Sequence, residues 1–360
     1  MSLTLPLLLV VVAVAIAYCG WIVVRHRVKS SPLDILPGPQ PVSFFFGAIP
    51  IFLKRQGWRR WAEHADAHGR AWLVRGFLHK HILITHDAKA LHTIMVKDQH
   101  IWQKNMAPSN NFTLLLGPGL LSTGAEQHKR QRKLLNPVFS AAHLREMTHI
   151  FYDVAHRMHS AMAKHVLDSG APQEMDVNGW MGRTTLEMLG QAGLGYSFDD
   201  FTGDKTDTYG ESLKLFFPAL SRTRFYNLVA GRLSWVLPDS AIRSMARLAP
   251  WQRVRRVVNI ADTIALRSRE IVAEKKAALA RGDAALKHEV GEGKDIMSIC
   301  LRANMAAADS EKMTDEELIA QMSTFILAGM DTTSNALSRI LWLLAMNPDV
   351  QEKLLSTEDS

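Results

Sequence analysis

Residues 313–349 read MTDEELIAQMSTFILAGMDTTSNALSRILWLLAMNPD, and this stretch predicts one long helix. A capping box starts the helix, because the Thr314 hydroxyl can accept from the amide of Glu317 while the Glu317 carboxylate accepts from the amide of Thr314. Pro348 ends it, since the residue before a proline is pushed out of the α region. Between these signals lie roughly 32 helical residues, about 48 Å at 1.5 Å per residue. We expect the rest of the chain to pack around this helix.

Small side chains line one face in the middle of this predicted helix. At 3.6 residues per turn, that face carries Phe325, Ala328, Gly329, Thr332 and Ala336. Thr332 can bond back to the carbonyl of Ala328, and Asp331 is the only charge between positions 318 and 338. Two interpretations remain open. The bare face packs closely against another helix, with Asp331 paired to a cation, or it accepts a flat ligand beside an acid and a hydroxyl that can pass protons.

Length and composition limit the classes of protein. The chain has 360 residues, of which 47% are hydrophobic and 21% charged, so we expect a globular fold. The net charge of +7 is too diffuse to indicate nucleic-acid binding, and it favours an acidic partner or a membrane surface. The two cysteines, Cys19 and Cys300, exclude a disulfide framework and a cysteine-rich zinc site. We assign no metal-ligating residue.

The N-terminal segment predicts a membrane anchor. Residues 1–24 contain no charge, and three basic residues follow at once: Arg25, Arg27 and Lys29. An apolar run of this length can span a bilayer, and the basic flank places the N-terminus in the lumen or outside and the body in the cytoplasm. The alternative is a cleaved signal peptide. Residues 25–50 then form a basic and proline-rich hinge, and residues 51–360 form the main domain.

A basic helix is predicted before Pro137, within residues 120–140 (LLSTGAEQHKRQRKLLNPVFS). His128 and Arg132 lie four positions apart and therefore share one face of this helix. The outward side is expected to present Lys129, Arg130 and Lys133. Such a basic run also occurs on a helix face that is only solvated. The residues alone do not decide between a solvated face and a face that binds an acidic group.

The remaining pattern predicts a mainly α fold with a small β-sheet (α+β). Residues 71–85 alternate as two strands around His79 and Lys80. Long helical patterns cover residues 140–167 and 251–281. The small sheet therefore accompanies a largely helical body.

Several of these segments resemble, in the expected order, the haem-thiolate monooxygenases of the cytochrome P450 family. Residues 328–333 (AGMDTT) are similar to the oxygen-binding signature of the central helix of that family. Residues 136–139 (NPVF) match the end of its third helix, and the proline-rich stretch resembles the hinge of its microsomal members. The resemblance runs from residue 1 to about residue 355. It implies a transmembrane helix followed by the N-terminal three quarters of a cytochrome P450-type fold.

The resemblance also implies roles for particular residues. Arg132 would hold a haem propionate together with His128, which stands where the family has a tryptophan and still offers a hydrogen-bond donor. Ala328 and Gly329 would form the wall over the iron, while Asp331 and Thr332 would carry the proton relay. The family further implies electrons from NADPH through a flavoprotein reductase that docks on the basic face. It also implies a lipophilic small-molecule substrate and a place in the endoplasmic reticulum membrane, in contact with lipid.

The axial cysteine ligand of the haem iron is absent from this sequence. The family carries it in a Phe-x-x-Gly-x-Arg-x-Cys-x-Gly loop, which does not occur here, while Cys19 lies in the predicted anchor and Cys300 precedes the central helix. We therefore expect a C-terminally truncated monooxygenase that is inactive alone. The alternative is a non-catalytic, membrane-anchored helical protein or regulatory fragment in which the same residues serve packing. An unrelated hydrolase is disfavoured, because no Gly-x-Ser-x-Gly motif is present.

Overall fold

The computed structural model divides the chain into two compact units, Met1–Gln103 and Lys104–Ser360. The residues it describes are 13–14, 17–18, 20–21, 31–54, 57–98, 101–102, 111–171, 174–202, 208–282 and 293–358. All six residues predicted to form the functional site belong to the second unit. The expected boundary between a hinge and a main domain at residue 50 remains a prediction.

The first unit contains a two-stranded sheet and short helices. β1 (Ala71–Arg75) and β2 (His81–Thr85) pair in antiparallel register, which confirms the predicted strands. Trp72 of β1 is fully buried and packs in a small core with Ala48 and Val74. The short elements of this unit are η1 (Pro32–Ile35), α2 (Ile49–Phe52), α3 (Gly57–His68), η2 (Phe77–His79), α4 (Ala88–His92) and η3 (Thr93–Lys97).

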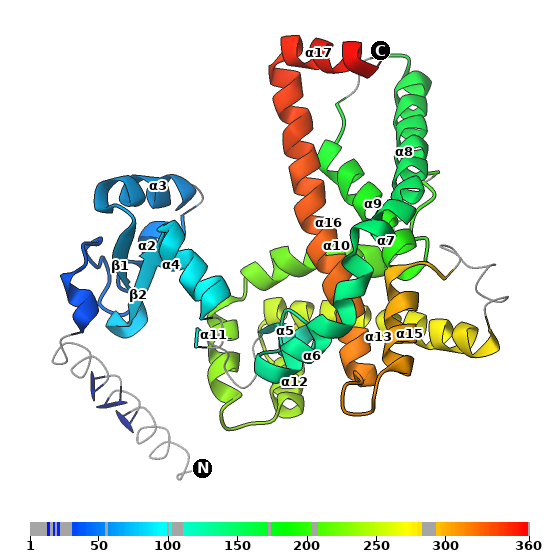
Figure 1. Cartoon of the computed structure of the whole chain (residues 1–360). Helices are drawn as coiled ribbons and strands as arrows, with labels where there is room; N and C mark the ends of the chain where they lie inside the picture. Colours follow the sequence, from blue (N-terminus) through cyan, green and yellow to red (C-terminus); the bar gives the residue numbers. More distant parts are fainter. Residues whose placement is uncertain are drawn as a thin grey trace. The chain divides into compact units, whose positions relative to one another are not determined.

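The regular elements in the described part of the second unit are all helices (Figure 1). The helix predicted over residues 140–167 is broken at Met147 into two. The helices of this unit are α5 (Asn111–Leu116), α6 (Ala125–Leu135), η4 (Asn136–Phe139), α7 (Ala141–Glu146), α8 (Thr148–Ser169), α9 (Val177–Leu189), η5 (Gly190–Leu194), α10 (Thr208–Ser221), α11 (Arg224–Leu233), α12 (Asp239–Leu248), α13 (Gln252–Arg281), α15 (Ile296–Ala306), α16 (Asp315–Met346) and α17 (Pro348–Glu358).

Helix α16 is the predicted central helix, and its observed bounds match the sequence signals. The capping box is present: Glu317 N donates to Thr314 Oγ1 at 3.2 Å, and Thr314 N donates to Glu317 Oε2 at 2.8 Å. The helix ends at Met346, directly before Asn347-Pro348. Side chains at four-residue spacing bury one stripe of α16 in the largest core, namely Leu318, Met322, Ile326 and Met330. Helices α9 and α13 are its main packing partners, and Figure 1 shows α9 beside the middle of α16.

Only the first two thirds of α16 is buried in this way. From residue 335 to residue 346 every side chain is exposed or half-buried, and the exposed ones include Leu341 and Trp342. The sequence predicted a groove in a helix that is buried along its middle. The structure instead leaves Ala328, Thr332 and Ala336 of this face exposed, while Phe325 and Gly329 are half-buried.

The predicted transmembrane helix over residues 1–24 is not supported. Crossing a bilayer takes about 20 apolar residues in one helix. Within the described ranges no helix combines the necessary length and apolarity, and of residues 1–24 only 13–14, 17–18 and 20–21 are described. This finding contradicts the predictions of an N-terminal membrane anchor and of a single-pass protein in the endoplasmic reticulum membrane with a lumenal N-terminus. The prediction of a mainly helical fold with a small sheet agrees with the structure.

Candidate functional site

A buried carboxylate joins the N-terminal turn of α16 to the basic helix α6. Glu317 is 2% exposed, and its Oε1 accepts hydrogen bonds from Gln127 at 2.8 Å, Arg130 at 2.5 Å and Gln131 at 2.9 Å. Burial raises the pKa of this carboxyl, but the hydrogen bonds to the carboxylate outweigh burial and hold the pKa below its ordinary 4.5. Glu317 therefore stays charged and holds α6 in place while it also caps α16.

Two buried glutamines extend this joint toward the middle of α16. Gln321 donates to Gln131 Oε1 at 2.9 Å and accepts from the amide of Leu120 at 3.0 Å. Gly119 lets the loop before α6 approach α16 closely, since a Cβ at this position would lie 2.7 Å from Thr324 Oγ1. Sequence reasoning missed these residues. The signal was Gln321, a large polar side chain in a mostly apolar part of the central helix.

Helix η4, which directly follows α6, reaches the small-residue face of α16. Phe139, the last residue of η4, packs edge-on against Phe325 with ring centroids 5.7 Å apart. Phe325 lies one turn before Ala328 on the same face. The polypeptide that follows Arg132 is thus placed beside the face that the sequence predicted as a ligand site.

The structure separates the four basic residues of α6 into different roles. Arg130 turns inward to Glu317, so the prediction that it faces outward is wrong. Lys133 Nζ lies 3.1 Å from Glu311, and Lys129 Nζ lies 3.9 Å from Glu126. Arg132 is exposed, and its guanidinium has no ion pair or hydrogen bond among the described residues. His128, predicted to act with Arg132, is half-buried.

Ala328 and Thr332 form the open part of the predicted face. Both are exposed, and Thr332 Oγ1 donates to the carbonyl of Ala328 at 2.8 Å, which confirms the predicted back-bond. Asp331 is half-buried, and its carboxylate has no hydrogen bond or cation partner in the described part of the chain. The interpretation in which Asp331 pairs with a cation receives no support from the described contacts. An exposed hydroxyl and an unpaired acid therefore lie next to each other on α16.

Gly329 lies on a different side of the helix from Ala328. A Cβ at Gly329 would lie 2.8 Å from Cδ1 of Leu189, the last residue of α9. One residue later, Thr185 of α9 donates to the carbonyl of Met330 at 3.3 Å. The glycine lets α9 approach α16 closely, so this residue serves the helix packing that the sequence left open as an alternative. Ala328 and Thr332 remain as the open face.

These residues suit a propionate at one edge of a haem and the flat surface of its ring. None of them can supply the axial thiolate ligand. The unpaired Arg132 guanidinium suits a propionate, and the open face at Ala328 and Thr332 leaves room for a flat ring. Cys300 is fully buried, and burial raises the pKa of its thiol to about 12, so it stays a protonated thiol in the core. Cys19 lies outside the described residues.

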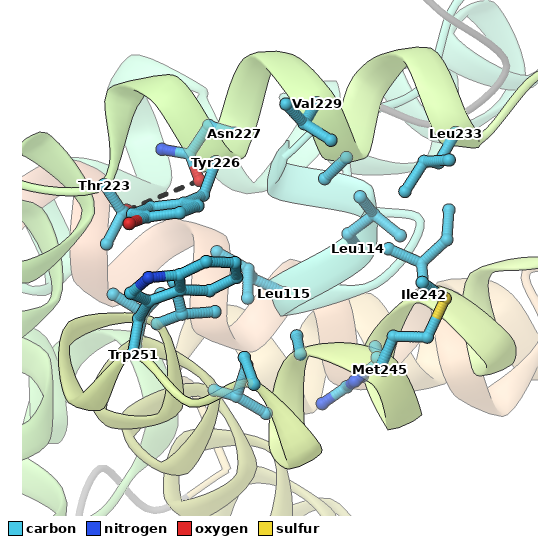
Figure 2. A pocket seen from close by; sticks show the side chains of 17 residues that line it. Leu114, Leu115, Thr223, Tyr226, Asn227, Val229, Leu233, Ile242, Met245 and Trp251 are labelled. Atoms are coloured by element: carbon cyan, nitrogen blue, oxygen red, sulfur yellow. Dashed lines mark hydrogen bonds between the residues drawn. The ribbon is translucent and has the colours of Figure 1, made fainter. Parts of the chain in front are cut away.

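A separate cavity of about 210 Å³ lies between α5, α11, α12 and α13 (Figure 2). Its walls are mostly apolar, with Leu114 and Leu115 from α5, Leu233 from α11 and Ile242 from α12. None of the six predicted site residues lines it, and no residue of α16 does. The sequence of this region could be read only as short apolar helices and loops, because a cavity depends on how the helices pack and not on any one of them.

Comparison with known proteins places this chain in a family. The family model "Cytochrome P450" matches residues 36–357. A ganoderic acid synthetase of Ganoderma lucidum is 53% identical over 349 residues, covering 96% of this chain and 63% of the relative. Cytochrome P450 monooxygenase 91 of Postia placenta is 42% identical over 341 residues, covering 93% of this chain and 62% of the relative. The chain spans about three fifths of the length of these curated relatives, less than the three quarters expected. By family match and identity, the chain belongs to the cytochrome P450 family.

Proposed function

We propose that this chain is the larger part of a haem-dependent monooxygenase that inserts one oxygen atom from O2 into a lipophilic organic substrate. The family membership gives the class of reaction. Two observations support the site: Ala328 and Thr332 are exposed one and two turns after Phe325, which packs against Phe139 of η4, and Arg132 of α6 has no protein partner among the described residues. A charged side chain left without a protein partner can bind an anionic ligand group.

The residues of this chain would hold the haem and supply protons. Arg132 and His128 would bind propionates, and Ala328 would allow the ring to approach α16. When bound, the haem would supply the oxygen chemistry. Thr332 donates to the Ala328 carbonyl at 2.8 Å and, being exposed, can turn its proton toward a ligand on that face. Asp331 would pass protons from solvent, because its carboxylate is half-buried and has no described partner.

Gly329 has a different part in this proposal. Its predicted role was to form the wall over the iron with Ala328. Its contact with Leu189 supports an indirect role, in which Gly329 keeps α16 at the right distance from α9. The wall over the ring is then formed by Ala328.

Electrons would come from NADPH through a flavoprotein reductase that docks on α6. Lys129, Arg132 and Lys133 are exposed on this helix. Lys133 is partly neutralised by Glu311, at 3.1 Å, so the net attraction for an acidic partner is smaller than the sequence indicated. The substrate is best sought first among molecules used by the ganoderic acid synthetase relative, because more than half of the aligned residues are identical.

We propose further that neither cysteine of these 360 residues supplies the axial thiolate. Burial keeps Cys300 as a neutral thiol in the core, which also favours the second candidate function, a non-catalytic helical protein. The carbon monoxide difference spectrum of the haem-loaded chain separates the cases. We expect no thiolate-type band, and such a band in this chain would contradict the proposal. A transcript read past the codon for Ser360 that encodes a cysteine-containing haem loop would favour the monooxygenase.

Haem titration of the purified chain tests the site itself. We expect saturable binding of hemin, seen as a shift of its Soret absorbance. Arg132→Ala should weaken binding by about ten- to 100-fold, since a hydrogen bond to a charged group contributes about 1.5–3 kcal/mol. Lys129→Ala removes the same charge from a neighbouring exposed position and should leave binding unchanged. Equal weakening in both variants would show non-specific attraction, and absence of saturable binding would overturn the proposal.

A further inference from the structure

We propose that His64 and His68 of α3 form a binding site for a divalent transition-metal ion such as Cu²⁺, Ni²⁺ or Zn²⁺. The two residues lie four positions apart at the end of the helix, so both side chains leave the same face. The nitrogen of a neutral imidazole is a ligand that suits these three ions. The site belongs to the first unit and the proposed haem residues belong to the second, so this inference does not depend on the proposed function.

The two imidazole rings have a spacing close to that of a metal chelate. Their centroids are 5.5 Å apart, and their planes differ by 6°. When two imidazoles bind one ion through bonds of about 2.0–2.1 Å, their ring centroids lie about 5 Å apart. Rotation of each ring about its Cβ–Cγ bond nearly keeps the position of the centroid. Such a rotation can therefore turn one nitrogen of each ring toward a shared ion.

The ring nitrogens of the pair are available to a ligand. Among the described residues, the side chains of His64 and His68 have no hydrogen bond and no ion pair. Both residues are half-buried, and their nitrogens keep contact with solvent, unlike the buried Nε2 of His143, which also has no partner. A metal ion can thus reach the pair from solution without displacing a protein group.

A buried aromatic cluster holds the pair in position. The ring of Trp72, which is fully buried in β1, lies with its centroid 6.0 Å from that of His64 and 6.1 Å from that of His68. Phe52 packs edge-on against His64, with centroids 5.5 Å apart. Helix α3 packs against β1, as Figure 1 shows. Because these contacts already restrict both side chains, less conformational entropy is lost when an ion binds.

The electrostatic surroundings also favour a bound cation. Burial, followed by the neighbouring His68, lowers the pKa of His64, while Glu63 raises this pKa and Arg60 lowers it further. His64 is therefore neutral at pH 7, which is the form that binds a metal ion. His68 is the last residue of α3, where the negative end of the helix dipole stabilises a positive charge.

The protein supplies two ligands, and water would occupy the other positions around the ion. Within the described ranges, no group of three or more His, Cys, Asp or Glu side chains is arranged to hold a metal. A structural zinc site has four protein ligands, so this site is an open one that exchanges its ion with solution. Its affinity should be highest for Cu²⁺, above Ni²⁺ and Zn²⁺.

Calorimetric titration of the full 360-residue chain with Ni²⁺ tests the site. All proteins carry His159→Gln, which removes the other closely spaced pair of exposed histidines, His156 and His159 of α8. His64→Gln and His68→Gln should each weaken the tightest Ni²⁺ site about 100-fold, because linking two ligands raises affinity by about 10²- to 10⁴-fold. The variant with both changes should bind no more weakly than either one, since one imidazole cannot chelate.

His92→Gln is the matched control, because it removes an exposed histidine at the end of α4 that has no second histidine one turn away. It should leave Ni²⁺ binding unchanged. Equal weakening in His92→Gln would overturn the proposal. Unchanged binding in both His64→Gln and His68→Gln would also overturn it, and would mean that the pair only packs against Trp72.

Pulsed electron paramagnetic resonance of the chain with one equivalent of Cu²⁺ gives a test that does not depend on how the variants fold. We expect two imidazole nitrogens coupled to the copper when His64 and His68 are both present. One coupled imidazole should remain in His64→Gln and in His68→Gln, with circular dichroism showing that the helices are kept. A spectrum with fewer than two coupled imidazoles in the protein that retains both histidines would overturn the proposal.

Discussion

Gln321 donates a 2.9 Å hydrogen bond to Gln131, and this buried pair holds the second turn of α16 against α6. Both side chains are fully buried, so neither can exchange its partner for water. Arg132 follows Gln131 directly, and Thr332 lies three turns further along α16. The glutamine pair, together with Glu317 and the Phe139–Phe325 contact, therefore sets the proposed propionate site relative to the proposed proton donor.

Glu317 should make the stability of the chain pH-dependent. Its pKa is lowered in the folded state, so the unfolded chain takes up the proton first on acidification. The contribution of Glu317 is then complete above its ordinary pKa of 4.5 and is lost as the pH falls through the lower, folded-state value. At pH 7 we expect Glu317→Gln to lower the free energy of unfolding by about 1–3 kcal/mol. Urea unfolding of both proteins between pH 7 and pH 3 checks this. If the difference in unfolding free energy between the two proteins stayed constant over that pH range, the prediction would be contradicted.

Substitution by valine should destabilise the fold at Gly329 but hardly at all at the adjacent Ala328. Gly329→Val places a methyl-bearing carbon against Leu189 and should destabilise the fold by about 1–3 kcal/mol through overpacking. Ala328→Val adds its bulk to the exposed face and should change stability by less than about 0.7 kcal/mol. Haem affinity should fall in Ala328→Val. Thermal unfolding measures the stability of both variants, and hemin titration measures their haem affinity. Equal losses of stability would mean that Gly329 and Ala328 do not lie on a packed side and an open side of α16.

Thr332→Ala should uncouple oxygen use from product formation in a complete, haem-loaded enzyme. Removing the hydroxyl takes away the proton donor on the open face, so reducing equivalents should appear as hydrogen peroxide and product per NADPH should fall several-fold. Thr332 is exposed, and its loss should change the free energy of unfolding by no more than about 0.5 kcal/mol. Thr333→Ala, at the next exposed position, is the matched control. Normal coupling in Thr332→Ala would assign the small-residue face to helix packing.

Charge reversal on α6 should slow reduction by the reductase. In a complete enzyme, Lys129→Glu with Lys133→Glu would repel an acidic partner, and the effect should be largest at low salt, because exposed charges are screened over about 10 Å at 0.1 M. Arg253→Glu, on an exposed position of α13, controls for net charge. Stopped-flow reduction at two ionic strengths measures the rates. An unchanged rate in the double variant would mean that this face of α6 is only solvated.

The sequence by itself determined those elements whose signals are local. The capping box of Thr314 and Glu317 and the stop before Pro348 predicted α16, and alternation predicted the β1–β2 hairpin. Hydrogen bonds and backbone preferences within about four residues set these features, so the sequence contains everything they need. The back-bond from Thr332 to Ala328 was predictable for the same reason. The apolar run at the N-terminus was the local signal that led to a contradicted prediction, since no membrane-spanning helix is found in the described residues.

Only the tertiary structure decided which side of each helix meets which partner. A helical repeat places Ala328 and Gly329 on one broad face, and the position of Leu189, 140 residues earlier in the chain, assigns Gly329 to packing and leaves Ala328 open. The same holds for Glu317, whose contacts on α6 lie between 186 and 190 residues away. The cavity beside α13 arises from the packing of four helices. Burial depends on distant surfaces that meet only in the folded chain, and no local pattern records which surfaces those are.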